Sequence, residues 1–300
     1  MTHRIEWPTL LLLMLTYAVW GAGTLLWDRS ALVSIVLMGV AIAQFSSLQH
    51  EALHGHPFRN AALNEALVFP ALTLFIPYRR FRDAHLQHHF DPSLTDPFDD
   101  PESNYRDPAE WARLPGWRRM LLRLNNTLAG RMLLGPVLGT LRFIAVELTV
   151  LRQPAVRQAW ACHAVGLAMV LGWLWWAGMP VRAYLIAVWL GFALLKIRTF
   201  LEHRAHDTVR ARTVVIEDRG PLSLLFLNNN FHVVHHMHPS VPWYDLPALY
   251  AARRDHYLRR NEGYVYRNYA QIFRAHFLRA KDPVSHPVWP VRKAPLSDDS

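Results

Sequence analysis

Histidines are the residues of this chain whose number and spacing are most informative about chemistry. The chain has 17 histidines in 300 residues, and eight of them fall into three short clusters. Positions i, i+3 and i+4 lie on one side of a helix, so each cluster can direct two or three imidazole rings at one point. The clusters are His50 and His54; His85, His88 and His89; and His232, His235 and His236.

Such grouping predicts metal binding, because buried imidazoles at the ends of apolar helices are costly unless something binds them. Imidazole suits iron, zinc, copper and nickel, so the ligand type alone does not name the metal. A zinc site takes three or four protein ligands, whereas eight or nine histidines are enough for two metal ions. Two iron ions are the economical interpretation. A further pair, His203 and His206, follows the last apolar run.

The first cluster also permits a different enzyme class. His50, Glu51 and His54 spell HExxH, the motif in which two histidines bind zinc and the glutamate acts as general base. An intramembrane zinc metalloprotease is therefore the alternative function. It leaves the other two histidine clusters without a purpose.

Long apolar runs must position these clusters. Hydrophobic residues make up 52% of the chain, and the 18% that are charged are absent from several stretches. Four runs approach the roughly 20 apolar residues that cross a bilayer as helix. We expect spans at about residues 8–27, 31–49, 159–180 and 183–200. The short connections within each pair predict two transmembrane helical hairpins, and hence an all-α integral membrane protein.

The remaining segments are expected on the cytoplasmic side, which the basic flanks of the spans identify. Residues 66–77 and 133–151 are too short or too charged for a simple crossing and are predicted to lie half-embedded in the interface. Residues 92–108 are rich in Pro and Asp and predict an irregular loop.

Beyond the spans, residues 246–260 and 264–279 have helical spacing, and residues 287–300 are expected to fray. Histidine-carrying regions at residues 50–125 and 201–280 would then form a cytoplasmic helical cap. We expect residues 1–300 to form a single membrane-bound domain, with both termini and the active site in the cytoplasm.

Composition excludes several classes of protein. The formal net charge is +9, but the basic residues flank apolar spans or fill the tail, which indicates lipid headgroups rather than nucleic acid as the partner. Cys162 is the single cysteine, so the chain can build no disulfide, cysteine zinc site or iron–sulfur cluster. Any electrons must come from another protein.

The three clusters resemble the histidine boxes of the membrane fatty acid desaturase and hydroxylase superfamily, which includes carotenoid ketolases. HEALH at residues 50–54, HLQHH at 85–89 and HVVHH at 232–236 match in order and spacing, over roughly residues 5–240. The extension HHFDPSLTDPFDD is similar to the bacterial acyl-lipid desaturase and carotenoid ketolase branches. The first box has three residues between its histidines where some acyl-CoA desaturases have four, which makes the acyl-CoA branch less favoured.

The resemblance implies a di-iron centre that uses O2 to desaturate, hydroxylate or ketolate a lipid, foremost a fatty acyl chain. It also implies an external electron donor of ferredoxin or cytochrome b5 type and, with the arginine-rich composition, a bacterial inner membrane. The implied metal ligands are the eight clustered histidines and His203, which is preferred over His206.

Other polar residues are expected around the metal ions. An amide of the run that precedes the third box would hold a metal-bound water, and nearby carboxylates would accept the second ring N–H of the ligands. These residues are Asn229, Asn230, Glu202, Asp91 and Asp96, with His206 as a further neighbour.

Overall fold

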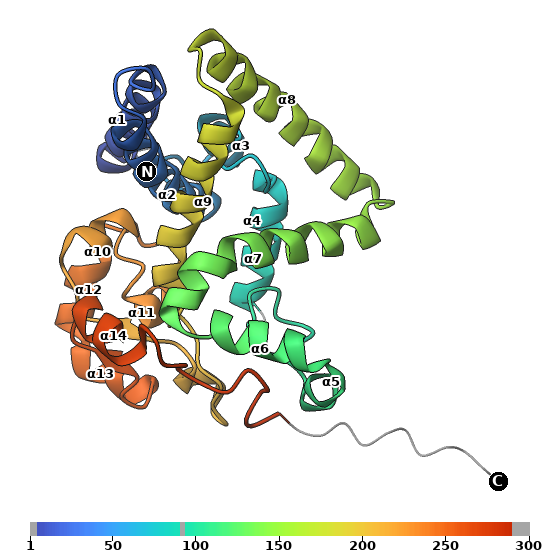
Figure 1. Ribbon diagram of the computed structural model, residues 1–300. Helices are drawn as coiled ribbons and strands as arrows, with labels where there is room; N and C mark the ends of the chain where they lie inside the picture. The colour runs from blue at the N-terminus through green and yellow to red at the C-terminus, as the bar shows by residue number, and fades with distance from the viewer. Residues whose placement is uncertain (1–4, 91–93, 290–300) are drawn as a thin grey trace.

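The computed structural model describes residues 5–90 and 94–289, and this part of the chain is mostly helical, with almost no strand. The elements in chain order are α1 (Trp7–Leu25), α2 (Ala31–Leu53), α3 (Ala61–Leu67), α4 (Tyr78–Phe90), α5 (Pro108–Arg113), α6 (Gly116–Asn125), α7 (Leu128–Val150), α8 (Pro154–Trp176), α9 (Val181–Thr199), η1 (Val209–Ala211), β1 (Val215–Ile216), α10 (Pro221–Leu225), α11 (His232–Met237), α12 (Leu246–Ala252), α13 (Arg254–Arg260), β2 (Val265–Tyr266) and α14 (Tyr269–His276). Figure 1 shows their arrangement. The predicted all-α fold class is confirmed.

Four described helices are long and apolar enough to cross a membrane: α1, α2, α7 and α8. The protein is therefore an integral membrane protein. The set differs from the expected spans, because it includes α7, which was expected to be half-embedded, in place of α9. Helix α9 has 19 residues but carries Arg182, Lys196 and Arg198. The assignment of residues 183–200 and of the other three ranges as spans stays a prediction.

The charges inside α7 are paired rather than left in lipid. Glu147 accepts hydrogen bonds from Arg80 of α4, with an N–O distance of 2.8 Å, and from the indole of Trp160. Helix α7 runs crosswise to α9 in Figure 1, and the Trp189 indole of α9 donates to the backbone of Leu133. The half-embedded position expected for residues 133–151 stays a prediction.

Helices α2 and α9 form the centre of the bundle, and small residues let them approach closely. A Cβ atom on Gly39 of α2 would lie 2.7 Å from the Leu190 side chain, and one on Gly191 of α9 would lie 2.7 Å from Ile42. Replacement of either glycine would therefore push the two helices apart.

The segment between α3 and α4, residues 68–77, is buried without being helical. Its backbone groups are satisfied by the bundle: Tyr184 donates to the carbonyl of Leu72, and a ring nitrogen of His163 lies 2.9 Å from the carbonyl of Leu74. Non-helical backbone at membrane depth is tolerated only where protein supplies such partners. The half-embedded position expected for residues 66–77 stays a prediction.

The helices after α9 form a cap at the end of the molecule opposite the α8–α9 connection (Figure 1). The helix expected over residues 246–260 is interrupted at Arg253, whose φ of −138° and ψ of 33° are not helical, so it is split into α12 and α13. The range 264–279 contains β2 and the shorter α14. Strands β1 and β2 pair in parallel through Val215 and Val265.

The described C-terminal segment crosses the loop between α4 and α5. The backbone N–H of Arg106 donates to the carbonyl of Val284 at 2.8 Å, and His286 lies 3.1 Å from the Thr95 hydroxyl. Lys281 Nζ donates to the carbonyl of His203 at 2.5 Å. We call residues 281–286 the strap. The fraying expected for residues 287–300 falls mostly on residues 290–300, which lie outside the described part of the chain.

Candidate metal centre

All nine histidines predicted as ligands lie where several helices end against one another. The first box closes α2, with His50 in its last turn and His54 at its C-cap, and the second box occupies the last two turns of α4. His203 follows α9. The third box forms α11, and two residues of positive φ, Leu227 and Asn228, lie in the loop before this helix. Positive φ is unfavourable for these residue types and turns the chain sharply before α11.

The nine imidazoles divide into two groups, and within each group the ligand atoms all lie within 4.8 Å of one another. The five-histidine group consists of His50, His54, His85, His89 and His235. The four-histidine group consists of His88, His203, His232 and His236. Each group draws on at least three separate segments of the chain.

The rings face one another through the nitrogen far from the backbone. In the four-histidine group, His203 Nε2 lies 2.9 Å from His88 Nε2 and 3.1 Å from His232 Nε2. In the five-histidine group, Nε2 of His50 and of His54 is buried and has no hydrogen-bond partner in the described structure. Buried polar atoms left unpaired are rare, and imidazoles that converge without partners fit a bound transition metal ion.

The charge state of these rings also suits metal binding, which requires neutral imidazole. Burial lowers the pKa of His54 from 6.5 to about 2 and that of His89 to about 3. Burial likewise holds four other pKa values well below 6.5, those of His203, His232, His235 and His236. At neutral pH these rings offer lone pairs rather than positive charge.

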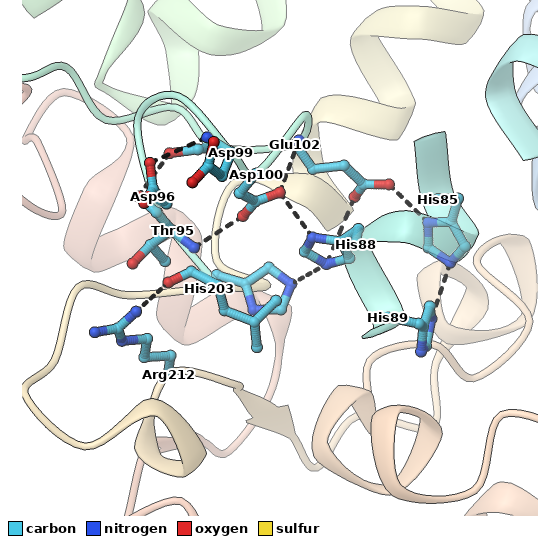
Figure 2. Close-up of polar contacts among 12 residues, drawn as sticks. His85, His88, His89, Thr95, Asp96, Asp99, Asp100, Glu102, His203 and Arg212 are labelled. Atoms are coloured by element: carbon cyan, nitrogen blue, oxygen red, sulfur yellow. Dashed lines mark hydrogen bonds and ion pairs between the residues drawn. The ribbon is translucent and has the colours of Figure 1, made fainter. Parts of the chain in front are cut away.

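Two carboxylates from the loop after α4 orient the second box (Figure 2). Nδ1 of His88 lies 2.8 Å from Asp100 Oδ1, and Nδ1 of His85 lies 2.6 Å from Glu102 Oε1. Burial opposes a charge on His88, but Glu102 and Asp100 outweigh it and raise its pKa to about 9. These contacts hold a proton on Nδ1 and turn Nε2 toward the other histidines, as outer partners of metal ligands do.

Asp100 and Glu102 were not predicted, and the carboxylate predicted in their place has another role. Asp96 accepts from the backbone N–H groups of Phe98 and Asp99 at 2.8 and 3.0 Å, so it caps its own turn. Both of these backbone groups bind Oδ1, and the role of Asp96 as a partner of a metal-ligating imidazole stays a prediction. Asp91 lies outside the described residues. The high density of acidic residues after the second box was the available signal.

A second outer network supports the third box. Asn229 Oδ1 lies 3.1 Å from His232 Nδ1, and the Asn229 amide donates to Glu202 Oε1 at 3.2 Å. Glu202 in turn pairs with Arg198 at 2.9 Å. The structure thus places Asn229 and Glu202 beside the four-histidine group. The Asn230 amide N–H group donates to the backbone carbonyls of Ile216 and Asp218, while its Oδ1 is buried without a hydrogen-bond partner in the described structure. The role predicted for Asn230 stays a prediction.

The structure also separates His203 from its rival. His206 Nδ1 accepts from the backbone of Thr208, and its Nε2 lies 3.5 Å from Glu262, so it neighbours neither histidine group. A local turn and Glu262 engage both ring nitrogens of His206, and its place near the metal ions stays a prediction. His203 occupies the expected place.

The geometry around Glu51 does not favour the protease alternative. Glu51 is buried, accepts from the backbone N–H of Trp243 at 3.2 Å and lies 3.7 Å from Nδ1 of His50. Its carboxylate therefore stands behind His50, on the side of the ring opposite Nε2. A general base would instead have to face the water bound at the metal.

Comparison with known proteins places this site in a family. The model of the fatty acid desaturase family matches residues 29–268, which include all nine histidines. The chain is also similar to beta-carotene ketolases from two strains of Paracoccus. One is 28% identical over 218 residues, covering 67% of this chain and 71% of the ketolase. The other is 27% identical over 219 residues, with the same two coverages.

The family match covers most of the chain and agrees with the resemblance seen in the three histidine boxes. The chain therefore belongs to the fatty acid desaturase family and is a membrane oxidoreductase of the desaturase and hydroxylase type.

Proposed function

We propose that this protein uses O2 and two iron ions to oxidise an unactivated C–H bond of a lipid. The observation that carries the proposal is the convergence of nine imidazoles in two adjacent groups. The five-histidine group would hold one iron ion and the four-histidine group the other. The iron pair, when bound, supplies the O2-dependent oxidation of the C–H bond.

The protein's own contribution is to keep the ligands neutral, oriented and dry. Burial removes the charge from most of the nine rings, and Asp100 and Glu102 fix the ring orientation of His88 and His85. The Asn229 amide links His232 to the Glu202 carboxylate in the same way. Preorganised ligands and exclusion of water are what a protein supplies to a metal-centred reaction.

The substrate is proposed to be a long apolar lipid that reaches the site from the bilayer. Both histidines of the first box lie at the end of α2, a helix long and apolar enough to cross the membrane. The family name indicates a fatty acyl chain. The relatives are beta-carotene ketolases, and their names favour the alternative that a ring CH2 group of a carotenoid is converted to a ketone.

The charge pattern of the chain supports a proposal for its cellular location. We propose that the site faces the cytoplasm of a bacterium, at its inner membrane, since basic residues flank the same ends of the hairpins. The chain has one cysteine and no cofactor motif of its own for storing electrons. An external electron carrier of ferredoxin or cytochrome b5 type therefore delivers them.

Expression in two bacterial hosts tests the proposal, one host that makes beta-carotene and one that makes only fatty acyl lipids. Mass spectrometry of total lipids should reveal a product that is two hydrogens lighter or one oxygen heavier, or a ketone derived from it. The product should be missing from cells that express a His203→Ala variant. A wild-type protein that retains iron but yields no new lipid in either host would contradict the proposal.

A further inference from the structure

A basic surface pocket lies on the cap, away from the histidine groups. It is lined by Arg210 of η1 and by His256, Arg259 and Arg260 of α13. All four side chains are exposed. Within the described structure none of these three arginines forms an ion pair, whereas the neighbouring Arg254 is bound to Glu217 at 2.6 Å. The pocket thus gathers three arginines that have no ion-pair partner among the described residues.

Aromatic rings connect this pocket to both ends of α11. The ring of His256 lies 5.5 Å from that of the buried Tyr257, measured between centroids. Tyr257 lies 6.3 Å from His238, whose backbone N–H donates to the carbonyl of His235 at 3.1 Å. The first route therefore runs from the pocket to a ligand of the five-histidine group.

The second route begins at the same tyrosine. Tyr257 stacks on Tyr250 at 6.0 Å, and Tyr250 lies 5.0 Å from Phe231. Phe231 is bonded to His232, a ligand of the four-histidine group. Tyr257 is consequently the common point from which rings lead toward both groups.

The position of the pocket distinguishes between anionic partners. Helix α13 lies at the end of the molecule opposite the α8–α9 connection (Figure 1). A lipid headgroup, the partner that the basic tail indicated, would not account for the aromatic rings that lead from this pocket toward both histidine groups. A soluble acidic protein is thus the partner that both the charge and the aromatic rings fit.

We propose that this pocket, which we call the basic dock, receives an acidic one-electron carrier protein and that Tyr257 lies on the path of its electrons. The inference rests on the proposed oxidase function. Hydroxylation of one C–H bond consumes one O2, two electrons and two protons and releases one water. Desaturation consumes the same and releases two waters. Two carrier molecules, each oxidised by one electron, supply the two electrons.

Electron-carrier encounters are small, weak and electrostatically steered, so charge reversal should act mainly on binding. The probe is an acidic plant-type ferredoxin, and the target is the full iron-loaded chain in nanodiscs. In the double variant Arg259→Glu and Arg260→Glu, the Kd for ferredoxin should rise roughly tenfold at low salt, and its dependence on salt should flatten. Turnover driven by dithionite should keep its wild-type rate.

Arg113→Glu is the matched control, because Arg113 is an exposed arginine on α5 at another part of the cap. It should bind ferredoxin as the wild type does. Equal ferredoxin affinity in the wild type and the double variant would overturn the basic dock, as would equal weakening in the control. Because Kd is measured without turnover, loss of affinity in the double variant supports docking even if no oxidised lipid is ever found, an outcome that would count only against the oxidase function.

Tyr257 is tested by the rate of iron reduction rather than by binding. Tyr257→Phe keeps the rings in contact and should reduce at a rate close to that of the wild type. Tyr257→Leu removes the ring contacts and should slow reduction of the iron by ferredoxin. The Kd for ferredoxin and the rate of reduction by dithionite should stay unchanged. Equal reduction rates for Leu and Phe variants that retain iron would exclude Tyr257 from the path.

Discussion

The second and third histidine boxes share the pattern HxxHH but distribute their ligands in opposite ways. In α4 the outer histidines, His85 and His89, join the five-histidine group, and His88 joins the four-histidine group. In α11 the outer pair, His232 and His236, joins the four-histidine group. The remaining His235 joins the five-histidine group. Each box thus gives two ligands to one group and one to the other.

Helix geometry explains this division. Successive residues are about 100° apart, so position i+4 points about 40° to one side of position i and i+3 about 60° to the other side. Positions i and i+4 aim together, while i+3 aims elsewhere. The first box, HxxxH, lacks the i+3 histidine and gives both ligands to one group. Two facing HxxHH helices therefore supply ligands to two separate histidine groups, which a single zinc ion would not need.

The second and third boxes differ in the contacts that stabilise their helices. Helix α4 has 13 residues, whereas α11 has six, too few for a helix that is stable alone. Surrounding structure supports α11: the backbone N–H of Val233 donates to the carbonyl of Val214 beside β1, and Phe231 packs on Tyr250. The same ligand pattern thus relies on local helix stability in one box and on tertiary contacts in the other.

The largest expected effect comes from removing a ligand of the four-histidine group. His203→Ala would leave the four-histidine group with three ligands, so we expect loss of about one iron per chain and at least a roughly 100-fold loss of product formation. Metal analysis and lipid mass spectrometry measure both. His206→Ala should retain full iron. The opposite pattern, with iron lost only from the His206 variant, would refute the assignment of His203.

A smaller effect is expected for the outer carboxylate of the second box. Glu102→Gln weakens the contact that orients His85, and such changes cost about 10- to 100-fold in metal affinity or activity. Chelator competition should show weaker retention of one iron, that of the five-histidine group. Glu110→Gln, an exposed carboxylate on α5, is the control. Equal retention in the two variants would show that Glu102 does not support the site.

Replacement of Glu51 distinguishes the proposed oxidase from the zinc protease alternative, through a smaller expected effect. Its carboxylate lies 3.7 Å from His50 Nδ1, farther than Glu102 lies from His85. Glu51→Gln should therefore lower lipid oxidation by less than roughly tenfold, an effect at the low end of those of outer partners. In a zinc protease the same change would remove the general base and abolish activity. Complete loss of product with both irons in place would contradict the outer role of Glu51.

The smallest effect concerns the support of α11. Glu217 follows β1 and accepts hydrogen bonds from Arg254 and Tyr250, each at 2.6 Å. The bond from Arg254 contributes most to lowering the pKa of Glu217 below 4.5, and the bond from Tyr250 adds to it. Because the folded-state pKa is depressed, this stabilisation is present above the ordinary pKa and is lost as the pH falls through the folded value. Glu217→Gln should reduce stability by less than about 1 kcal/mol near neutral pH and by nothing in strong acid. Thermal unfolding at both pH values checks this, and a difference that persists in acid would contradict it.

Local spacing explains what could be predicted from the sequence. The clustered histidines repeat at helical intervals, so their convergence within each box follows from the chain itself. Asp100 and Glu102 could not be chosen among the acidic residues after α4, because their approach to His88 and His85 depends on how that loop folds back. Asp96 and Asn230 bind nearby backbone groups through Oδ1 and Nδ2 respectively, contacts that residue spacing does not reveal.

Prediction of the cap elements and of the membrane spans was limited by weak local signals in the sequence. Strands β1 and β2 have two residues each, which leaves no periodic pattern to detect. The interior charges of α7 suggested a poor membrane helix, but Arg80 and Trp160, distant in sequence, pair with Glu147. Contacts between segments that are distant in sequence thus determine these features, and the spacing of residues along the chain could not predict them.

The strap has a consequence for how the protein is made. Lys281 holds the backbone of His203, and the residues after it bind the loop that carries Asp100 and Glu102. A nascent chain synthesised only as far as α14 already contains all nine histidines, but its acidic loop still lacks the hydrogen bonds to the strap. We therefore expect iron to be held fully only after the strap has been synthesised and has docked.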